Sequence, residues 1–323
     1  MGKLDPTPTL VPDEDASGDH DSALGDDIST SSDSITSSIA DYRQENGRTY
    51  HRYKDGKYTF PNDDQENEIL DMQHHMFLLT FNGRLGLAPP NEPNSKVERV
   101  LDVGTGTGIW AMDYGDEHRG AQKISVPPNV QFYVDDLEES WDYPQPFDYI
   151  HSRMMTASIA SWDKYLSDIF EVRNLAPGGY LELQELDIFA KSDDGSLTAE
   201  HALSKWLTLI HGASVQLGRP YQDIDGLKSR MAEAGFTDIV ETIFKWPMNT
   251  WPQDHKYKEL GAWQKENMNL GLESFSMALL TRAHDWTKEQ VDALLDEVRK
   301  DLINKRIHAY WPIYSIYGRK PEA

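Results

Sequence analysis

Apolar residues recur at helical spacing between residues 69 and 79. They follow Asn62 and Asp63, which are candidate helix caps, and they are Ile69, Leu70, Met72, Met76, Phe77 and Leu79. Glycines and prolines between residues 83 and 93 then interrupt the pattern. The spacing predicts a helix that packs on the edge of a domain.

Further along, short apolar runs alternate with helical patterns. The runs predict strands at residues 97–103, 130–134, 147–151, 180–185, 239–244 and 309–317. A helix is predicted from Ile109 to Glu117, and another after Thr287 and Gln290, which fit a capping box. Strands that alternate with helices favour an α/β fold with a parallel, doubly wound sheet.

Residues 1–42 show no such period. They are rich in Asp, Ser, Thr and Pro, and they contain ten acidic residues and one Lys. A segment of this composition buries too little apolar surface to offset its chain entropy, so we predict a disordered acidic tail. The remaining residues, 43–323, are long enough for one large α/β domain, and a second domain is not required.

Charge and composition narrow the class of protein. The formal net charge is −23, with 31 Lys and Arg against 54 Asp and Glu, which argues against a nucleic-acid partner. The chain has no Cys, which excludes disulfides and thiolate chemistry. It also lacks an apolar run of about 18 residues and an apolar leader, so no membrane association is expected. We expect a cytoplasmic protein, with the nucleus as the alternative.

A glycine-rich turn joins the first of these strands to its helix. Gly104, Gly106 and Gly108 alternate there, and glycine lets the backbone approach a ligand at the helix N-terminus. A dinucleotide fingerprint would place its third glycine at position 109, which is Ile109. Asp102 could meet the ammonium of an amino-acid-bearing nucleoside. The alternative is a tight turn that serves packing alone.

The run Leu101-Asp102-Val103-Gly104-Thr105-Gly106-Thr107-Gly108 resembles the first motif of the class I methyltransferases. Residues 147–150 look like the fourth strand of that family, and residues 175–181 look like the turn into its fifth strand. The resemblance implies a Rossmann-like sheet with an antiparallel last strand. It also implies S-adenosyl-L-methionine as methyl donor, held by Asp102, Gly104, Thr105, Gly106 and Gly108.

More narrowly, the chain is similar to the fungal LaeA-like methyltransferase family over most of residues 45–318. The similar runs are residues 53–58, 73–75, 104–110, 127–130, 147–155 and 181–184. The resemblance implies a methyltransferase-like protein that acts on a small molecule of fungal secondary metabolism. Two alternatives stay open. One is a degenerate fold that no longer binds the donor and assists another pathway enzyme, and the other is a nuclear regulator that works through protein contacts.

One part of the family's donor site is missing from the sequence. The second strand of the fold should end in an acidic residue that holds the ribose, about 20 residues beyond Asp102, but Gln122 stands there. Only residues 121–129 separate the first helix from the next predicted strand, too few for a strand and a crossover. We therefore predict a truncated second-strand region. Losing the ribose contact would cost about 1.5 to 3 kcal/mol, which impairs or abolishes donor binding.

The end of the third predicted strand agrees better with the family. Asp136 and Leu137 match its pattern for reading the adenine amino group and packing the ring, and Asp135 is the alternative partner. The other interpretation of this acidic pair is a solvated loop.

Candidate substrate-side residues follow the fourth and fifth strands, at the edge where open α/β sheets bind ligands. His151 could act as a general base, with Arg153 beside it, and Gln184 and Glu185 occupy the same edge. A structural hydrogen-bonding role is the alternative for His151.

Residues 246–286 form a stretch dense in Trp, Phe and Met that we predict to be a cap. Such a cap would suit a flat aromatic small molecule, and a helical cap that buries its own apolar face is the alternative. His74 and His75 are adjacent on a helix and so point to different sides, which argues against a shared metal. No metal site is expected.

Overall fold

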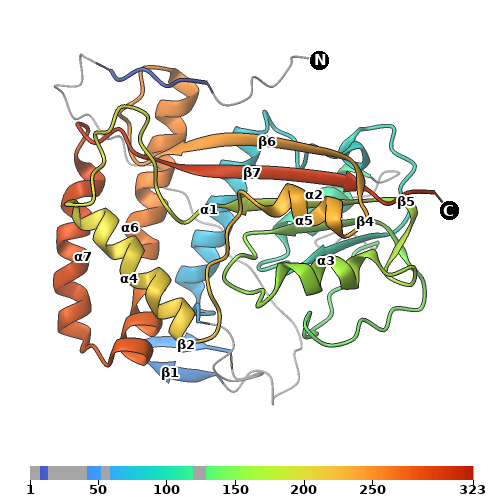
Figure 1. Ribbon diagram of the computed structural model, residues 1–323, viewed down its shortest axis with the longest axis horizontal. Helices are drawn as coiled ribbons and strands as arrows, with labels where there is room; N and C mark the ends of the chain where they lie inside the picture. The colour runs from blue at the N-terminus through green and yellow to red at the C-terminus, as the bar shows by residue number, and fades with distance from the viewer. Residues whose placement is uncertain (1–7, 14–41, 52–58, 119–128, 323) are drawn as a thin grey trace.

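The computed structural model describes residues 8–13, 42–51, 59–118 and 129–322. Its centre is a five-stranded sheet in the order β3-β4-β5-β7-β6 (Figure 1). The strands are β3 (Val100–Val103), β4 (Phe147–Arg153), β5 (Leu175–Leu186), β6 (Thr237–Pro247) and β7 (Tyr310–Arg319). The first three are parallel, and β7 runs antiparallel to both of its neighbours. The predicted Rossmann-like sheet with an antiparallel last strand is confirmed.

Helices cover both faces of the sheet because its strands alternate two sets of side chains. Ile150, Leu181 and Leu183 pack against α3 (Trp162–Phe170) and α5 (Leu227–Glu233). On the opposite face, α2 (Ile109–Glu117) packs on Tyr149, and α1 (Asp64–Thr80) packs toward β6 and β7. The predicted helix near residues 62–79 is therefore α1, and Asp63 caps it by accepting from the Glu66 amide.

Three helices form a bundle at one end of the sheet. These are α4 (Ala202–Gln216), α6 (His255–His284) and α7 (Lys288–Ile303), with α1 between the bundle and the strands (Figure 1). The capping box of Thr287 and Gln290 is present at the start of α7. Met248, Met268 and Met277 are buried within the bundle core. The apolar side chains of the predicted cap thus cover its own helices.

The N-terminal part of the chain is tied to this bundle. The hairpin of β1 (Arg43–Glu45) and β2 (Arg48–Tyr50) contacts α6 through an ion pair between Glu45 and Arg282. A short 3-10 helix, η1 (Pro89–Asn91), precedes β3. Residues 8–13 belong to the segment predicted to be disordered, yet they pair with the loop before α6, where the Gln253 amide donates to Val11 O at 2.7 Å. Leu10 is buried there, which fixes these six residues, and the rest of residues 1–41 lies outside the described ones.

One predicted strand is wrong. Residues 130–134 form no strand, and Phe132, Tyr133 and Val134 are exposed, Tyr133 by 73%. In the described part of the chain, β3 pairs with β4 alone, and a cavity separates its other edge from this segment. A strand needs a hydrogen-bonded neighbour, so the run lines the cavity instead. The predicted truncation of the second strand concerns residues 121–129, of which 121–128 lie outside the described residues.

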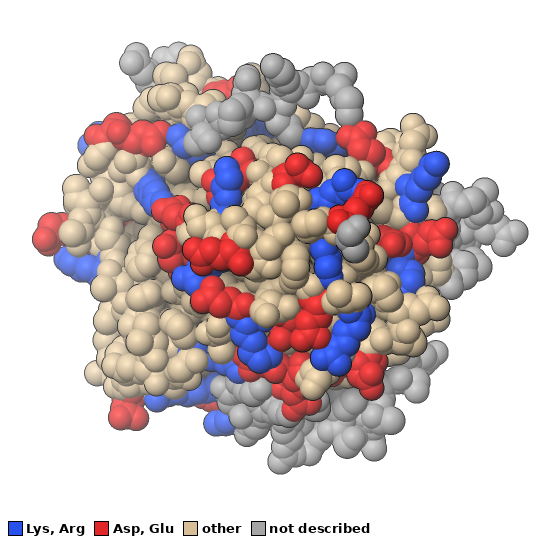
Figure 2. Space-filling view, turned by 45° about the vertical axis from the view of Figure 1, so that its right-hand side comes forward, with Lys and Arg blue, Asp and Glu red and all other residues tan. Residues whose placement is uncertain are grey.

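The surface carries charges of both signs. On the face shown in Figure 2, Lys and Arg lie among Asp and Glu instead of gathering into a basic patch. Because the net charge is −23, this face offers little to a polyanion. None of the described helices is both long and apolar enough to cross a membrane.

Candidate functional site

The glycine-rich turn lies at the carboxyl end of β3 and leads into α2. Gly104, Gly106 and Gly108 all have positive φ, at 72°, 57° and 81°, a conformation that other residues adopt at a cost. Gly108 is the N-cap of α2 and supplies no side-chain cap. The first turn of α2 therefore presents its amide groups and the positive end of its dipole to the turn.

Asp102 and His151 occupy paired positions on the parallel strands β3 and β4. Asp102 Oδ1 lies 2.7 Å from His151 Nδ1, and the imidazole is fully buried. The indole of Trp110 stacks on it, with centroids 3.8 Å apart and planes 5° apart. Because a carboxylate only accepts, Nδ1 carries the proton of this bond, and Nε2 has no partner among the described residues.

The stack continues along α2. Trp110, Tyr114 and His118 are four residues apart, so they share one face of the helix. Tyr114 lies 5.0 Å from Trp110 and 3.9 Å from His118, with nearly parallel rings. This column of rings forms one wall of the space beside β3.

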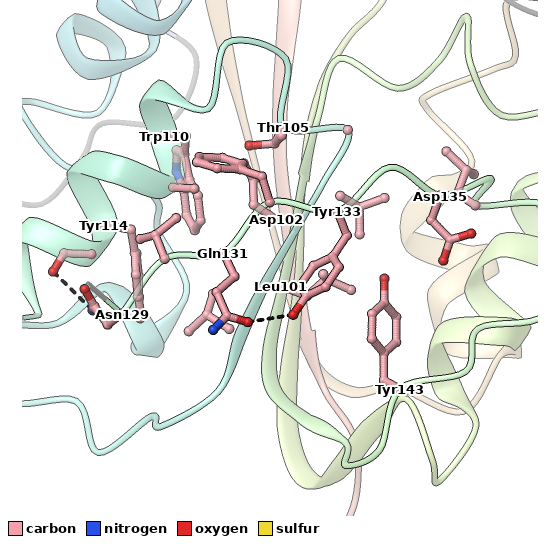
Figure 3. A pocket seen from close by; sticks show the side chains of 18 of the residues that line it. Leu101, Asp102, Thr105, Trp110, Tyr114, Asn129, Gln131, Tyr133, Asp135 and Tyr143 are labelled. Carbon is pink, nitrogen blue, oxygen red and sulfur yellow. Dashed lines mark hydrogen bonds between the residues drawn. The ribbon is translucent and has the colours of Figure 1, made fainter. Parts of the chain in front are cut away.

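That space is a cavity of about 480 Å³ (Figure 3). Trp110 and Tyr114 line it from α2, and Tyr133, Asp135 and Tyr143 line it from the other side (Figure 3). Asp102, Gly104 and Thr105 border it at the glycine-rich turn, and Leu137 also lines it. An apolar, aromatic space with a few acidic groups suits a nucleoside.

Asp135 and Asp136, which follow residues 130–134, have different surroundings. Asp135 lines the cavity, whereas Asp136 is not among its lining residues and accepts from the Glu138 amide at 3.1 Å. The structure therefore turns the carboxylate of Asp135, rather than that of Asp136, toward the space.

A second cavity, of about 60 Å³, lies between the glycine-rich turn and α1. His151, Arg153 and Met154 line it from the end of β4, and His74 lines it from α1. The two cavities share a set of lining residues, which are Asp102, Gly104, Thr105 and Trp110. They are therefore neighbours across the glycine-rich turn.

Arg153 reaches this smaller cavity from the carboxyl end of β4, where it is half-buried. Its guanidinium donates to Gln184 Oε1 at 2.8 Å and to His74 Nδ1 at 3.1 Å, and it lies over the Phe77 ring. Burial lowers the pKa of Arg153 to about 10, and the nearby charge of Asp102 opposes this shift. A half-buried cation whose hydrogen-bond partners are neutral can bind an anion.

The buried carboxylate of Glu182 on β5 was not predicted to support the site. The Glu182 carboxylate accepts from the amides of Leu87 and Ala88 at 2.8 and 2.9 Å, and from the hydroxyls of Tyr149 and Ser315. Glu182 thereby anchors the loop before β3. The Trp110 indole, on α2, donates a hydrogen bond to Leu85 O of this loop. The alternation of polar residues at 180, 182 and 184 was the available signal.

Glu185 points to the opposite face of β5. Its carboxylate accepts from the amides of Met155 and Thr156, at 3.0 and 3.2 Å, so it fixes the turn after β4. Burial raises the pKa of Glu185 to about 8, and this effect is larger than the opposing effect of the two hydrogen bonds. Glu185 lines neither cavity of the site, and its role here is to hold the backbone.

The two adjacent histidines of α1 have different neighbours. His74 Nε2 lies 3.0 Å from Asp113 of α2, while the His75 ring packs against Trp263 of α6, 4.8 Å between centroids. Across residues 8–13, 42–51, 59–118 and 129–322, no group of three His, Asp or Glu side chains could hold a metal ion.

The chain's own side chains lie close over the glycine-rich turn. A Cβ placed on Gly104 would lie 2.4 Å from Met155 Sδ, and one on Gly108 would lie 2.7 Å from the Phe132 ring. Asp71 of α1 accepts from the Thr107 hydroxyl at 2.6 Å. These contacts leave no room for larger residues in the turn, and they bring a thioether directly onto it.

A family model described as "Methyltransferase domain" matches residues 72–241. The methyltransferase pytC of Aspergillus terreus is 37% identical over 306 residues, which cover 91% of this chain and 93% of pytC. The secondary metabolism regulator LAE1 of Cochliobolus heterostrophus is 36% identical, over 86% of this chain and 94% of LAE1. The protein-methionine methyltransferase laeA of Emericella nidulans is 32% identical, over 87% of this chain and 77% of laeA. The chain therefore belongs to the methyltransferase domain family, and its relatives include fungal methyltransferases and regulators of secondary metabolism.

Proposed function

We propose that the protein transfers a methyl group from S-adenosyl-L-methionine to a small molecule of fungal secondary metabolism. The observation that carries the proposal is the pair of neighbouring cavities across the glycine-rich turn, one lined by aromatic rings and one that Arg153 and His151 border. Together they suit a ligand that joins a nucleoside to an amino acid. Bound there, the donor would supply a methyl group on a positively charged sulfur.

The residues present fit such a donor. Asp102 would meet the ammonium group, and the turn of Gly104, Thr105, Gly106 and Gly108 would lie under the chain that links the two halves. Thr105 Oγ1 is buried and has no partner among the described residues, as expected of a group that serves a ligand. Asp135 and Leu137 line the nucleoside side, with Asp136 as the neighbouring alternative.

His151 is buried, stacks on Trp110 and contacts Asp102 of β3, so we assign it a positioning role through Asp102. Methyl transfer from a sulfonium depends on placing the acceptor in line more than on proton transfer. A general base at His151 is the competing assignment. A merely positioning histidine would change donor affinity without changing the pH profile of transfer.

The name of LAE1, a secondary metabolism regulator, supports a role in secondary metabolism, and the name of pytC supports methyl transfer. The regulator reading would place the protein in the nucleus with a protein partner, whereas a tailoring enzyme would act in the cytoplasm. A degenerate fold that assists another pathway enzyme is the third reading. It follows if the donor does not bind.

A second acceptor is favoured by one contact. Met155 Sδ lies against Gly104, at the turn where the donor would bind, and one relative is named a protein-methionine methyltransferase. A thioether can accept a methyl group on sulfur to give a sulfonium. Met155 of the chain itself is therefore the acceptor that this alternative names.

One labelling experiment tests these readings together. The full chain is incubated with S-adenosylmethionine that carries a deuterated methyl group and with a metabolite extract from a fungus lacking the gene. Mass spectrometry then follows the label in the metabolites and in the peptide that holds Met155. Label in a metabolite supports the small-molecule reading, and label in the peptide supports the second one. Label in neither, from folded protein, contradicts both, and Asp102→Ala is the control that should carry none.

A further inference from the structure

The smaller cavity contains polar groups that the hydrogen bonds of the protein leave unused. Its volume is about 60 Å³, which corresponds to about two water molecules. His151 Nε2 and Thr105 Oγ1, two buried atoms of its lining residues, have no partner in the described part of the chain. Buried polar atoms are normally paired, so these two point to a ligand.

Arg153 is the cation of this cavity. No carboxylate of the described residues forms an ion pair with it, and its hydrogen-bond partners are the neutral groups of Gln184, His74 and Leu85. Partial removal of an unpaired charge from water is costly, and a bound anion offsets that cost. The uncapped N-terminus of α2 also faces this cavity, since Ile109 and Trp110 line it.

A relay of side chains holds Arg153 in place. Its Nη1 donates to His74 Nδ1, so the remaining ring nitrogen, Nε2, carries the proton that His74 donates to Asp113. Gln184 holds the Nε group from β5. Arg153 is therefore fixed before any ligand arrives, which lowers the entropic cost of binding.

The two sides of the cavity have opposite character. The Asp102 carboxylate accepts hydrogen bonds, whereas Arg153 donates them and the Thr105 hydroxyl can donate one. An α-amino acid group has the complementary arrangement, with an ammonium beside a carboxylate. We infer that Arg153 recognises the carboxylate of an α-amino acid group whose ammonium meets Asp102.

Two ligands could bring this group. One is the methyl donor, whose nucleoside would occupy the larger cavity across the shared residues, and in this form the inference rests on the proposed function. The other is a separate substrate that carries an α-amino acid group. The carboxylate chemistry at Arg153 is the same for both, and the experiment separates them.

The test uses isothermal titration of the full chain with three nucleosides. These are S-adenosylhomocysteine, its decarboxylated analogue and 5′-methylthioadenosine, which lacks the whole amino acid. We expect Arg153→Met to lower the affinity for S-adenosylhomocysteine by about ten- to hundredfold and to leave the affinity for 5′-methylthioadenosine unchanged. The decarboxylated analogue should bind wild type and Arg153→Met equally, and Arg153→Lys should recover part of the loss.

A second titration covers the other source. Glycine is added to protein saturated with S-adenosylhomocysteine, and the melting temperature is followed. Stabilisation by glycine that Arg153→Met removes, with unchanged S-adenosylhomocysteine affinity, assigns the amino-acid group to a second ligand and supports the inference. No dependence on Arg153 in either titration overturns it. If no nucleoside binds wild type while glycine still binds through Arg153, the proposed function fails and the amino-acid site stands.

Discussion

Asp102 Oδ1 and His151 Nδ1 lie 2.7 Å apart on neighbouring parallel strands, and this contact ties the glycine-rich turn to the end of β4. A carboxylate accepts about four hydrogen bonds, so Asp102 keeps capacity for a ligand ammonium. The pair thus links the amino-acid side of the proposed donor site to the strand that carries Arg153.

Replacing the imidazole tests this link. We expect His151→Phe to weaken S-adenosylhomocysteine about tenfold in isothermal titration, because Asp102 loses its fixed partner while the stack on Trp110 is kept. His308→Phe is the matched control. His308 forms a comparable pair with Asp194 but lines neither cavity of the site. An equal loss in both variants would show a general effect on the fold instead.

The acidic pair after residue 134 gives a second prediction. Asp135→Asn should lower the affinity for 5′-methylthioadenosine about five- to tenfold, because Asp135 lines the larger cavity. Asp136→Asn should change that affinity little, because Asp136 does not line this cavity and an Asn side-chain oxygen still accepts from the Glu138 amide. The reverse order of the two variants would assign the adenine contact to Asp136, as the sequence pattern predicts.

The contact between Gly104 and Met155 predicts a coupling. Gly104→Ala forces a side chain at φ 72° and places its Cβ against Met155 Sδ, so urea unfolding should show a loss of about 2 to 4 kcal/mol. Gly104→Ala combined with Met155→Ala should lose less than the sum of the two single variants. Strict additivity would mean that the thioether does not rest on the turn.

Glu185 predicts a pH dependence of stability. Its pKa of about 8 in the folded protein is above the ordinary value, so the folded state holds a proton that the unfolded state releases. This contribution is fully present below about pH 4 and is lost as the pH rises toward 8, by at most about 1.4 kcal/mol per unit. Wild type should therefore lose stability relative to Glu185→Gln between pH 5 and about 8. Parallel curves for the two proteins would contradict the raised pKa.

Much of the fold follows from local patterns in the sequence. The strand before the glycine-rich turn, the parallel order and the capping box at Thr287 all depend on spacing between near neighbours. The prediction of a strand at residues 130–134 was wrong because an apolar run forms a strand only beside a hydrogen-bonded neighbour. A cavity separates these residues from the free edge of β3. Whether such a segment has a neighbouring strand depends on the whole fold and cannot be read from the segment alone.

The site was less predictable. Asp102 and the glycines carry their own signal, but the relay from Asp113 through His74 to Arg153 joins α2, α1 and β4. No spacing along the chain brings these three residues together. Glu182 was missed for the same reason, since its partners lie on three different segments.

The most direct test of the account is isothermal titration of the full chain with S-adenosylmethionine and with S-adenosylhomocysteine. We predict micromolar binding of both, and its loss in Asp102→Ala. No heat at millimolar ligand, from protein that unfolds cooperatively, would contradict a donor site across the two cavities.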